Sequence, residues 1–225
     1  MNRSESTFDK QYYDEIYRTD DRTYQRPRTS PYYPMYRMAA EFVRETGCRH
    51  VLEVGCGSGV LAEMLIQGGA DYKGFDISSV GIERAKIRNP SGAFALGDAT
   101  AVESYNVAYD VIVCCEVLEH IEQDLKVVSL WRAGVACVCS VPNFLNESHV
   151  RHFKSEAEVT ERYGKYIDIK RTVRIPKRAG ANLTWGEYFR RLRWSRDDPK
   201  RVLGILGLNA FNWYGGWFVF LGNRR

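Results

Sequence analysis

The sequence predicts an α/β fold in which helices cover both faces of a mostly parallel sheet. Apolar runs of strand length, rich in β-branched residues, occur at residues 51–54, 109–115 and 135–141. Amphipathic stretches of helical period occur at residues 35–46, 58–66, 80–88 and 120–131. Strands and helices that alternate in this way are joined by right-handed crossovers, which leave the sheet covered on both sides.

An N-terminal arm of residues 1–36 precedes the sheet and is rich in tyrosine and charge. Residues 9–17 are expected to be helical, because Phe8, Tyr12 and Ile16 are spaced four residues apart. Two interpretations of the arm remain open. It either packs over the sheet or acts as a lid that excludes water from a bound ligand.

The first strand runs into a glycine-rich turn that opens a helix. Gly55, Gly57 and Gly59 lack a Cβ, so each can adopt a positive φ and let a ligand approach the main chain. Free amide groups at the start of the next helix favour a negative group on that ligand. The dinucleotide-binding fingerprint would need glycine at position 60, where the chain has Val60. The turn therefore predicts a nucleotide-type pocket of another kind.

The pattern Glu-x-Gly-x-Gly-x-Gly that begins at Glu53 resembles motif I of class I S-adenosylmethionine (SAM) dependent methyltransferases. The resemblance implies a Rossmann-like sheet of seven strands, mostly parallel with an antiparallel last strand, in a domain of residues 37–225. It also implies that this loop, from Glu53 through Cys56 to Gly59, cradles the aminoacyl end of SAM.

The later strand ends fall where the same family places its other cofactor residues. Asp76 and Ile77 follow the second strand, and by similarity Asp76 would hold the ribose hydroxyls. Asp98 and Ala99 follow the third strand, where the family's acid contacts adenine, and Glu116 follows the fourth. Open α/β sheets bind ligands at the carboxyl ends of their strands, so these residues are expected to line the SAM site.

A candidate metal site lies beside the expected cofactor, at Glu116, Glu119 and His120. If Glu116 begins a helical turn, the other two residues are its i+3 and i+4 neighbours on one face. His149 and His152 follow the fifth strand and could complete the set. The Glu-x-x-Glu-His pattern with a downstream histidine resembles the metal site of small-RNA 3′-terminal 2′-O-methyltransferases. It is also similar to metal-assisted hydroxyl methyltransferases acting on quinols and sugars.

The resemblance implies Mg²⁺ or Mn²⁺ held by Glu116, Glu119, His120 and His152. A divalent cation lowers the pKa of a bound hydroxyl, and a histidine can then take its proton. His152, His149 and His120 are the candidates for that base. Many class I methyltransferases carry a Glu-His pair here without a metal, so a purely structural role for His120 also remains open.

The C-terminal part of the chain is basic and aromatic. Residues 165–201 contain twelve Lys or Arg and four Asp or Glu, whereas the whole chain has a net charge of +4. This mixture could bind RNA or line a sugar pocket, and for residues 187–194 a solvated helix face is the alternative. By the same resemblance, strands at 167–175 and 217–221 close the sheet around an insertion at about 176–214 that shapes acceptor specificity.

Six cysteines without metal-ligand spacing, four of them in expected strands, indicate buried thiols in a reducing compartment. No apolar signal segment and no membrane span of about 20 residues is visible, so we expect a cytoplasmic protein. The predicted function is SAM-dependent O-methylation, assisted by a divalent metal, of a small hydroxyl acceptor such as a sugar or glycoside. The alternatives are ribose 2′-O-methylation at an RNA 3′ end, N-methylation, and a catalytically silent SAM-binding regulatory protein.

Overall fold

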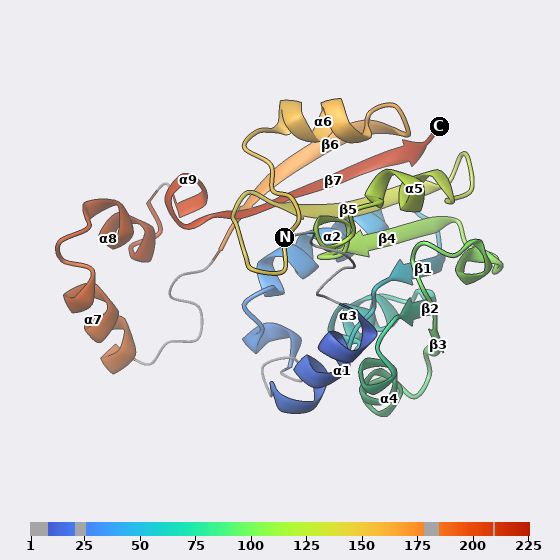
Figure 1. The fold of residues 1–225 in the computed structure, drawn as a ribbon, viewed down its shortest axis with the longest axis horizontal. Helices are drawn as coiled ribbons and strands as arrows, with labels where there is room; N and C mark the ends of the chain where they lie inside the picture. The colour runs from blue at the N-terminus through green and yellow to red at the C-terminus, as the bar shows by residue number, and fades with distance from the viewer. Residues whose placement is uncertain (1–8, 21–25, 178–184, 209) are drawn as a thin grey trace, which may run out of the picture.

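The computed structural model describes residues 9–20, 26–177, 185–208 and 210–225. Within these residues seven strands form one sheet in the order β3-β2-β1-β4-β5-β7-β6 (Figure 1). The neighbours from β3 to β5 are parallel, and β7 is antiparallel to both β5 and β6. The strands are β1 His50–Val54, β2 Asp71–Asp76, β3 Ala93–Leu96, β4 Val111–Cys115, β5 Ala136–Pro142, β6 Ile167–Pro176 and β7 Gly216–Arg224. The predicted seven-stranded sheet with its antiparallel last strand is confirmed.

Helices flank this sheet and extend beyond one edge of it. In the first half of the chain they are α1 Lys10–Thr19, η2 Pro27–Thr29, α2 Tyr33–Glu45, α3 Val60–Gln67, α4 Ser79–Arg88 and η3 Val102–Tyr105. In the second half they are η4 Leu118–His120, α5 Asp124–Ser129, α6 Glu156–Tyr163, α7 Trp185–Trp194, α8 Pro199–Ile205 and α9 Ala210–Tyr214. None of the helices in the described part of the chain has the length and apolar character needed to cross a bilayer.

Alternate residues of each strand build two separate apolar cores, one on each face of the sheet. In β4, Ile112 and Cys114 belong to the core that α5 and α6 cover. Val111 and Val113 belong to the core that α2 and α3 cover. The six cysteines are free thiols, and the four in β4 and β5 are buried as predicted.

The predicted helix over residues 120–131 is wrong in its first half. The chain forms only the short 3₁₀ turn η4 there, and the α-helix begins at Asp124. The reason is Ile121, which follows η4 with extended backbone at a φ of −109° and a ψ of +118°. Glu116, which precedes η4, has a φ of +59°, in the left-handed region that a right-handed helix excludes. Glu116 therefore does not begin a helical turn.

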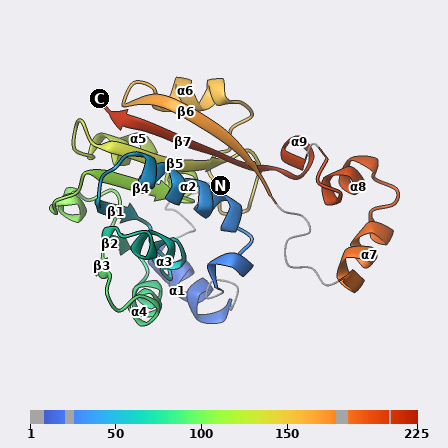
Figure 2. The ribbon, with the colours of Figure 1, turned by 180° about the vertical axis from the view of Figure 1, so that it is seen from behind.

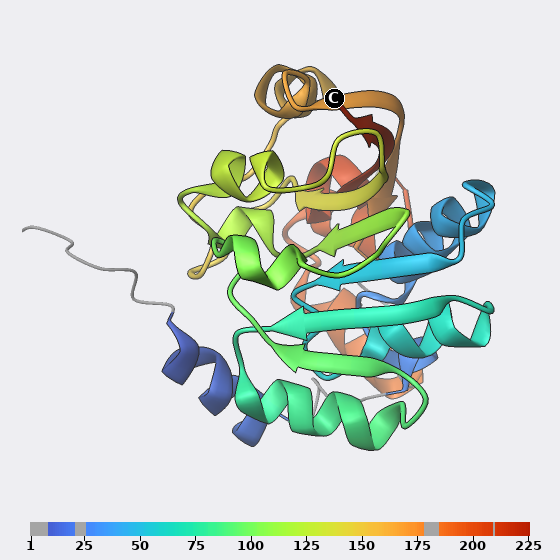
Figure 3. The same cartoon turned by 90° about the vertical axis from the view of Figure 1, so that its right-hand side faces the viewer.

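The N-terminal arm and the carboxyl ends of the parallel strands lie on the same side of the molecule. Figure 3 shows the arrowheads of these strands and helix α1, in dark blue, facing that side. Helices α7 and α8 of the insertion stand apart from the sheet, and α9 connects them to β7 (Figures 1 and 2). The ligand-binding edge is thus bordered by the arm, while the outer helices lie away from it.

Candidate active site

The glycine-rich turn between β1 and α3 has the backbone that its sequence predicts. Gly55, Gly57 and Gly59 have φ values of +68°, +50° and +75°. Asp76 at the end of β2 ties the turn down, because one carboxylate oxygen accepts the Gly57 N–H at 2.8 Å and the other accepts the Ser78 N–H at 2.8 Å. Burial raises the pKa of Asp76, and these amide donors oppose the shift. The conformation of the turn is therefore fixed by a side chain at the end of the neighbouring strand β2.

A cavity of about 520 Å³ lies at the carboxyl ends of the strands. Six residues predicted to bind the cofactor line it: Gly55, Asp76, Ile77, Asp98, Ala99 and Glu116. The orientation of Asp98 is fixed, because its Oδ1 accepts the N–H of Thr100 at 2.7 Å and its hydroxyl at 2.9 Å. The volume and the carboxylates at the strand ends suit a nucleoside-type cofactor.

A second cavity of about 450 Å³ adjoins the first. It is lined by three more of the predicted cofactor residues, Glu53, Cys56 and Gly57. Burial raises the pKa of Glu53 to about 8, although the Tyr72 hydroxyl donates to its carboxylate at 2.5 Å. Gly59 lines neither cavity. A Cβ there would meet Asn89, so its glycine is required by packing against α4.

Five tyrosines form one side of this second cavity: Tyr12, Tyr13, Tyr17, Tyr32 and Tyr36. All five come from the arm or from the start of α2, so the arm is part of the site. The sequence left open whether the arm packs over the sheet or acts as a lid, and it did not identify these side chains as lining residues. Their density in residues 1–36 was the available signal.

Helix α1 is fastened to the start of α4, next to the cofactor cavity. Asp14 accepts hydrogen bonds from the Ser78 hydroxyl at 2.6 Å and from the Val80 N–H at 3.2 Å. The ring of Tyr17 lies against Gly57, where a Cβ would be only 2.3 Å from the phenolic oxygen. The arm therefore covers the glycine-rich turn and narrows access to both cavities.

The two cavities share Tyr13, Tyr17, Gly55, Glu116 and His120. This junction is the position at which a ligand in one cavity would meet a ligand in the other. Of the residues predicted to carry the chemistry, Glu116 and His120 therefore lie at this junction.

Glu119, His120 and His149 form a cluster in which three potential ligand atoms lie within 4.8 Å of one another. Both carboxylate oxygens of Glu119 are buried without a hydrogen-bond partner in the described part of the chain. Burial raises the pKa of Glu119, and the nearby charge of Glu116 raises it further. Buried polar atoms without partners are rare in proteins, and either a bound cation or a proton shared with Glu116 would satisfy these oxygens.

Both imidazoles of the cluster are oriented by backbone carbonyls. His120 Nδ1 lies 3.0 Å from the Ser148 oxygen, and His149 Nδ1 lies 3.2 Å from the Phe144 oxygen. A carbonyl only accepts, so each Nδ1 carries the hydrogen and each Nε2 keeps its lone pair in the neutral ring. Burial and the neighbouring His149 lower the pKa of His120 to about 4, and burial lowers the pKa of His149. Both rings are therefore neutral at pH 7.

Two predicted ligands, Glu116 and His152, are not members of this cluster. Glu116 lines both cavities, and burial raises its pKa to about 7. His152 follows Val150 by two residues, and the Val150 N–H donates to the Glu119 carbonyl at 2.9 Å. In the cluster, His149 occupies the position that the sequence analysis proposed for His152. The structure thus brings together Glu119, His120 and the histidine that the sequence left as the rival of His152.

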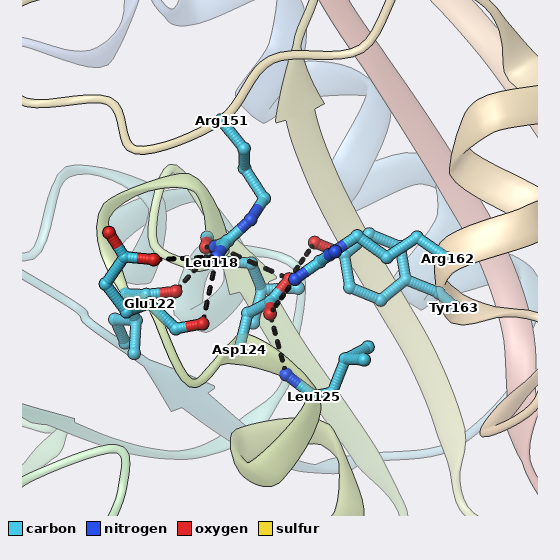
Figure 4. Close-up of polar contacts among 8 residues, drawn as sticks. Leu118, Glu122, Asp124, Leu125, Arg151, Arg162 and Tyr163 are labelled. Carbon is cyan, nitrogen blue, oxygen red and sulfur yellow. Dashed lines mark hydrogen bonds and ion pairs between the residues drawn. The ribbon is translucent and has the colours of Figure 1, made fainter.

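Arg151 holds the loop after β5 against the turn that carries Glu119 and His120 (Figure 4). Its guanidinium donates to the carbonyls of Leu118 and Ile121, and to that of Glu122 at 3.0 Å. The same guanidinium pairs with the buried Asp124 at 3.4 Å. The His120 and His149 rings, 4.9 Å apart, are positioned by these contacts between two strand-end loops.

Residues 51–133 match the family model described as a methyltransferase domain. By sequence this region is therefore similar to a methyltransferase domain. It contains the glycine-rich turn and the strand-end acids, and it ends before His149 and the insertion.

The ubiquinone biosynthesis O-methyltransferase of Bordetella avium is 36% identical over 85 residues, which are 36% of this chain and 35% of that protein. The protein of the same name from Pectobacterium carotovorum is 35% identical over 85 residues, 36% of each chain. The match thus spans about a third of the length of the curated relatives.

Solved structures extend the likeness to the whole fold. Magnesium protoporphyrin IX methyltransferase from Synechocystis, with bound SAH, superposes with a TM-score of 0.62 at 17% identity, covering 96% of this chain and 100% of that one. The N-methyltransferase NodS from Bradyrhizobium japonicum superposes with a TM-score of 0.63 at 15% identity, covering 95% and 97%. The described chain therefore has the fold of SAM-dependent methyltransferases.

Proposed function

We propose that the protein is a SAM-dependent O-methyltransferase that activates its acceptor hydroxyl at the Glu119, His120 and His149 cluster. The observation that carries the proposal is the location of His120 at the junction of the two cavities. The sulfonium methyl group is attacked in line, so donor and acceptor must meet across such a junction. The curated relatives are named O-methyltransferases, which favours oxygen as the acceptor atom.

The cluster fits a divalent cation. Glu119 offers carboxylate oxygens without partners among the described residues, and His120 and His149 each offer an Nε2 lone pair. We infer that these three residues hold the ion. Two imidazoles and one carboxylate suit Mn²⁺ better than Mg²⁺, which prefers oxygen ligands. When bound, the cation would lower the pKa of the acceptor hydroxyl.

The chain itself supplies neutral imidazoles and an aromatic wall at the junction. Because burial keeps His120 and His149 uncharged at pH 7, each Nε2 lone pair is available to the cation or, where no cation is bound, to the hydroxyl proton. Tyr13 packs edge-on against His120 with ring centroids 6.1 Å apart, and with Tyr17 it lines the junction. These features suit an acceptor that must be deprotonated as it is methylated.

The acceptor we propose is a small hydroxyl compound such as a sugar or glycoside. The second cavity of about 450 Å³ would also receive the aminoacyl end of SAM at Glu53, Cys56 and Gly57, so only its remaining volume is open to the acceptor. Its tyrosine rings can pack on the C–H faces of such a molecule, and their hydroxyls can bond to its polar edge.

Calorimetric titration of the chelator-treated full chain with SAM, then with Mn²⁺, tests the proposal. We expect SAM to bind without metal, and Mn²⁺ to bind as a separate event. His149→Ala should weaken Mn²⁺ binding by roughly tenfold or more and leave SAM binding intact. His152→Ala is the matched control and should retain both.

Methyl transfer is then measured with labelled SAM and parallel panels of hydroxyl and amine acceptors. Transfer to a hydroxyl, dependent on His149, supports the proposal. Absence of SAM binding, or transfer to amines alone, would overturn it. Equal metal affinity in the wild type and in His149→Ala would remove the metal from it.

A further inference from the structure

Helices α7 and α8 form a lobe that stands off the edge of the sheet (Figures 1 and 2). The lobe is connected to the domain through α9. Gly204 of α8 lies directly against the ring of Tyr214, and Phe211 of α9 packs on Phe218 of β7 with ring centroids 5.1 Å apart. The lobe is therefore attached by packed contacts at α9, while α7 is its outermost helix.

Helix α7 has one continuous apolar face. Trp185, Tyr188, Phe189 and Leu192 occur at positions i, i+3, i+4 and i+7, which places them on one side of a helix. Trp185 is 78% exposed and Phe189 is 61% exposed. Contiguous exposed aromatic surface of this kind marks an interaction site, whereas single exposed apolar residues do not.

The other sides of the same helix carry arginines and the exposed Trp194. Residues 185–201 contain six Lys or Arg and three Asp or Glu, a net charge of +3 in a chain whose total is +4. Arg190, Arg191 and Arg193 flank the apolar face at intermediate and opposite helical angles. A second copy of this lobe would bring like charges together, so the charge favours an anionic partner.

We propose that α7 docks on an anionic lipid bilayer, lying in its interface with Trp185, Phe189 and Leu192 toward the acyl chains. An amphipathic helix with arginine on its polar side and tryptophan, phenylalanine and leucine on the other is the composition that binds in this way. Tryptophan is favoured at the depth of the headgroups. Leu206 and Leu208, at the end of α8, add two exposed aliphatic side chains to the lobe.

A single-stranded nucleic acid fits these residues less well. Nucleic-acid sites place separate aromatic faces along a basic groove, where successive bases can stack. Here the rings of Trp185 and Phe189 stack on each other, with centroids 6.2 Å apart and planes 29° apart. The two rings thus pack side by side as one apolar surface, which an aliphatic residue, Leu192, completes. The basic segment predicted at 165–201 as an RNA site is therefore better explained, in this lobe, by a membrane surface.

The test is co-sedimentation of the full chain with phosphatidylcholine vesicles, with and without about a third phosphatidylglycerol. We expect binding to the anionic vesicles that weakens as salt rises. The double variant Trp185→Ser/Phe189→Ser should lose at least tenfold in partition coefficient. Arg193→Gln should lose about fivefold, the effect of one basic residue near an anionic surface.

The matched control is Lys86→Gln/Ile87→Ser on helix α4, which removes one cation and one apolar side chain that is 71% exposed. This control should bind as the wild type does, and all variants should keep the wild-type SAM affinity and thermal midpoint, because the changed side chains are exposed. No binding to either vesicle overturns the proposal. So does equal binding by the Trp185→Ser/Phe189→Ser variant, or a gel shift with single-stranded RNA in place of vesicle binding.

Discussion

Asp124→Asn should destabilise the folded protein far more than a similar change at its exposed neighbour Glu122. Asp124 is the buried anion of the contacts in Figure 4, with a side chain that is 1% exposed. It accepts two hydrogen bonds from Arg162, at 2.7 and 2.6 Å, and one from the Tyr163 hydroxyl at 2.8 Å. It also pairs with Arg151 at 3.4 Å.

The magnitude follows from which charges lose their partner. Asparagine keeps the volume of Asp124 but removes its negative charge. The Arg151 guanidinium, which is 12% exposed, then stays buried without this anionic partner. Breaking a buried ion pair from one side costs about 3 to 5 kcal/mol. Arg162 is 34% exposed and can be partly rehydrated, which favours the lower end, about 3 kcal/mol.

Urea unfolding measures this change, with Glu122→Gln as control. Glu122 faces the same Arg151 at 3.9 Å, but its side chain is 76% exposed. An exposed pair contributes at most about 1 kcal/mol. With a urea slope of about 3 kcal/mol/M, Asp124→Asn should shift the midpoint by about 1 M and Glu122→Gln by much less.

Equal midpoint shifts for the two variants would refute this reasoning. A loss below about 1 kcal/mol for Asp124→Asn would do the same, because it would mean that the pair is solvated in the native state. The slope must be compared as well, since a changed slope signals a changed unfolded or native ensemble.

Three further outcomes are expected. Burial raises the pKa of Glu53 from 4.5 to about 8, so its contribution to the free energy of unfolding should be complete below pH 4.5 and lost as pH rises to 8. Urea midpoints measured across this range should show that Glu53→Gln removes this part of the pH dependence of stability. Gly57→Ala should weaken SAM binding at least tenfold by calorimetry, because a Cβ there clashes with the arm, whereas Gly47→Ala, with a similar φ but open space, should not. Asp14→Ala should speed SAM release severalfold in stopped-flow experiments, because it loosens α1 from α4. Glu15→Ala, at an exposed side chain, should match the wild type. Unchanged release in Asp14→Ala would mean that α1 is not a lid.

The sheet could be predicted because its strands are apolar runs whose ends carry glycine or acid. Residues 111–115 show this best, since every side chain is buried and the acid that follows lines the cofactor cavity. An unbroken apolar run is enough to predict such a strand, because a sheet covered on both faces requires apolar residues at every position of its inner strands.

The chemistry at the strand ends could be predicted only in part. Glu119 and His120 were found from their spacing, but the left-handed backbone of Glu116 is not encoded by any periodic pattern and turned the expected helical turn into η4. The choice between His149 and His152 depends on an irregular loop, where side-chain direction does not follow residue number. The burial of Asp124 depends on Arg162 from the distant helix α6, and no local sequence pattern carries that information.

Arg151 gives the candidate site a dependence on helix α6, which contributes no residue to either described cavity lining. Its guanidinium joins the backbone of η4 to Asp124, and Asp124 is held in turn by Arg162 and Tyr163 of α6. Coupling between two places in a protein acts equally in both directions. A ligand that orders the imidazole pair should therefore slow amide hydrogen exchange in α6, and substitutions in α6 should alter ligand affinity in a region that a list of lining residues would overlook.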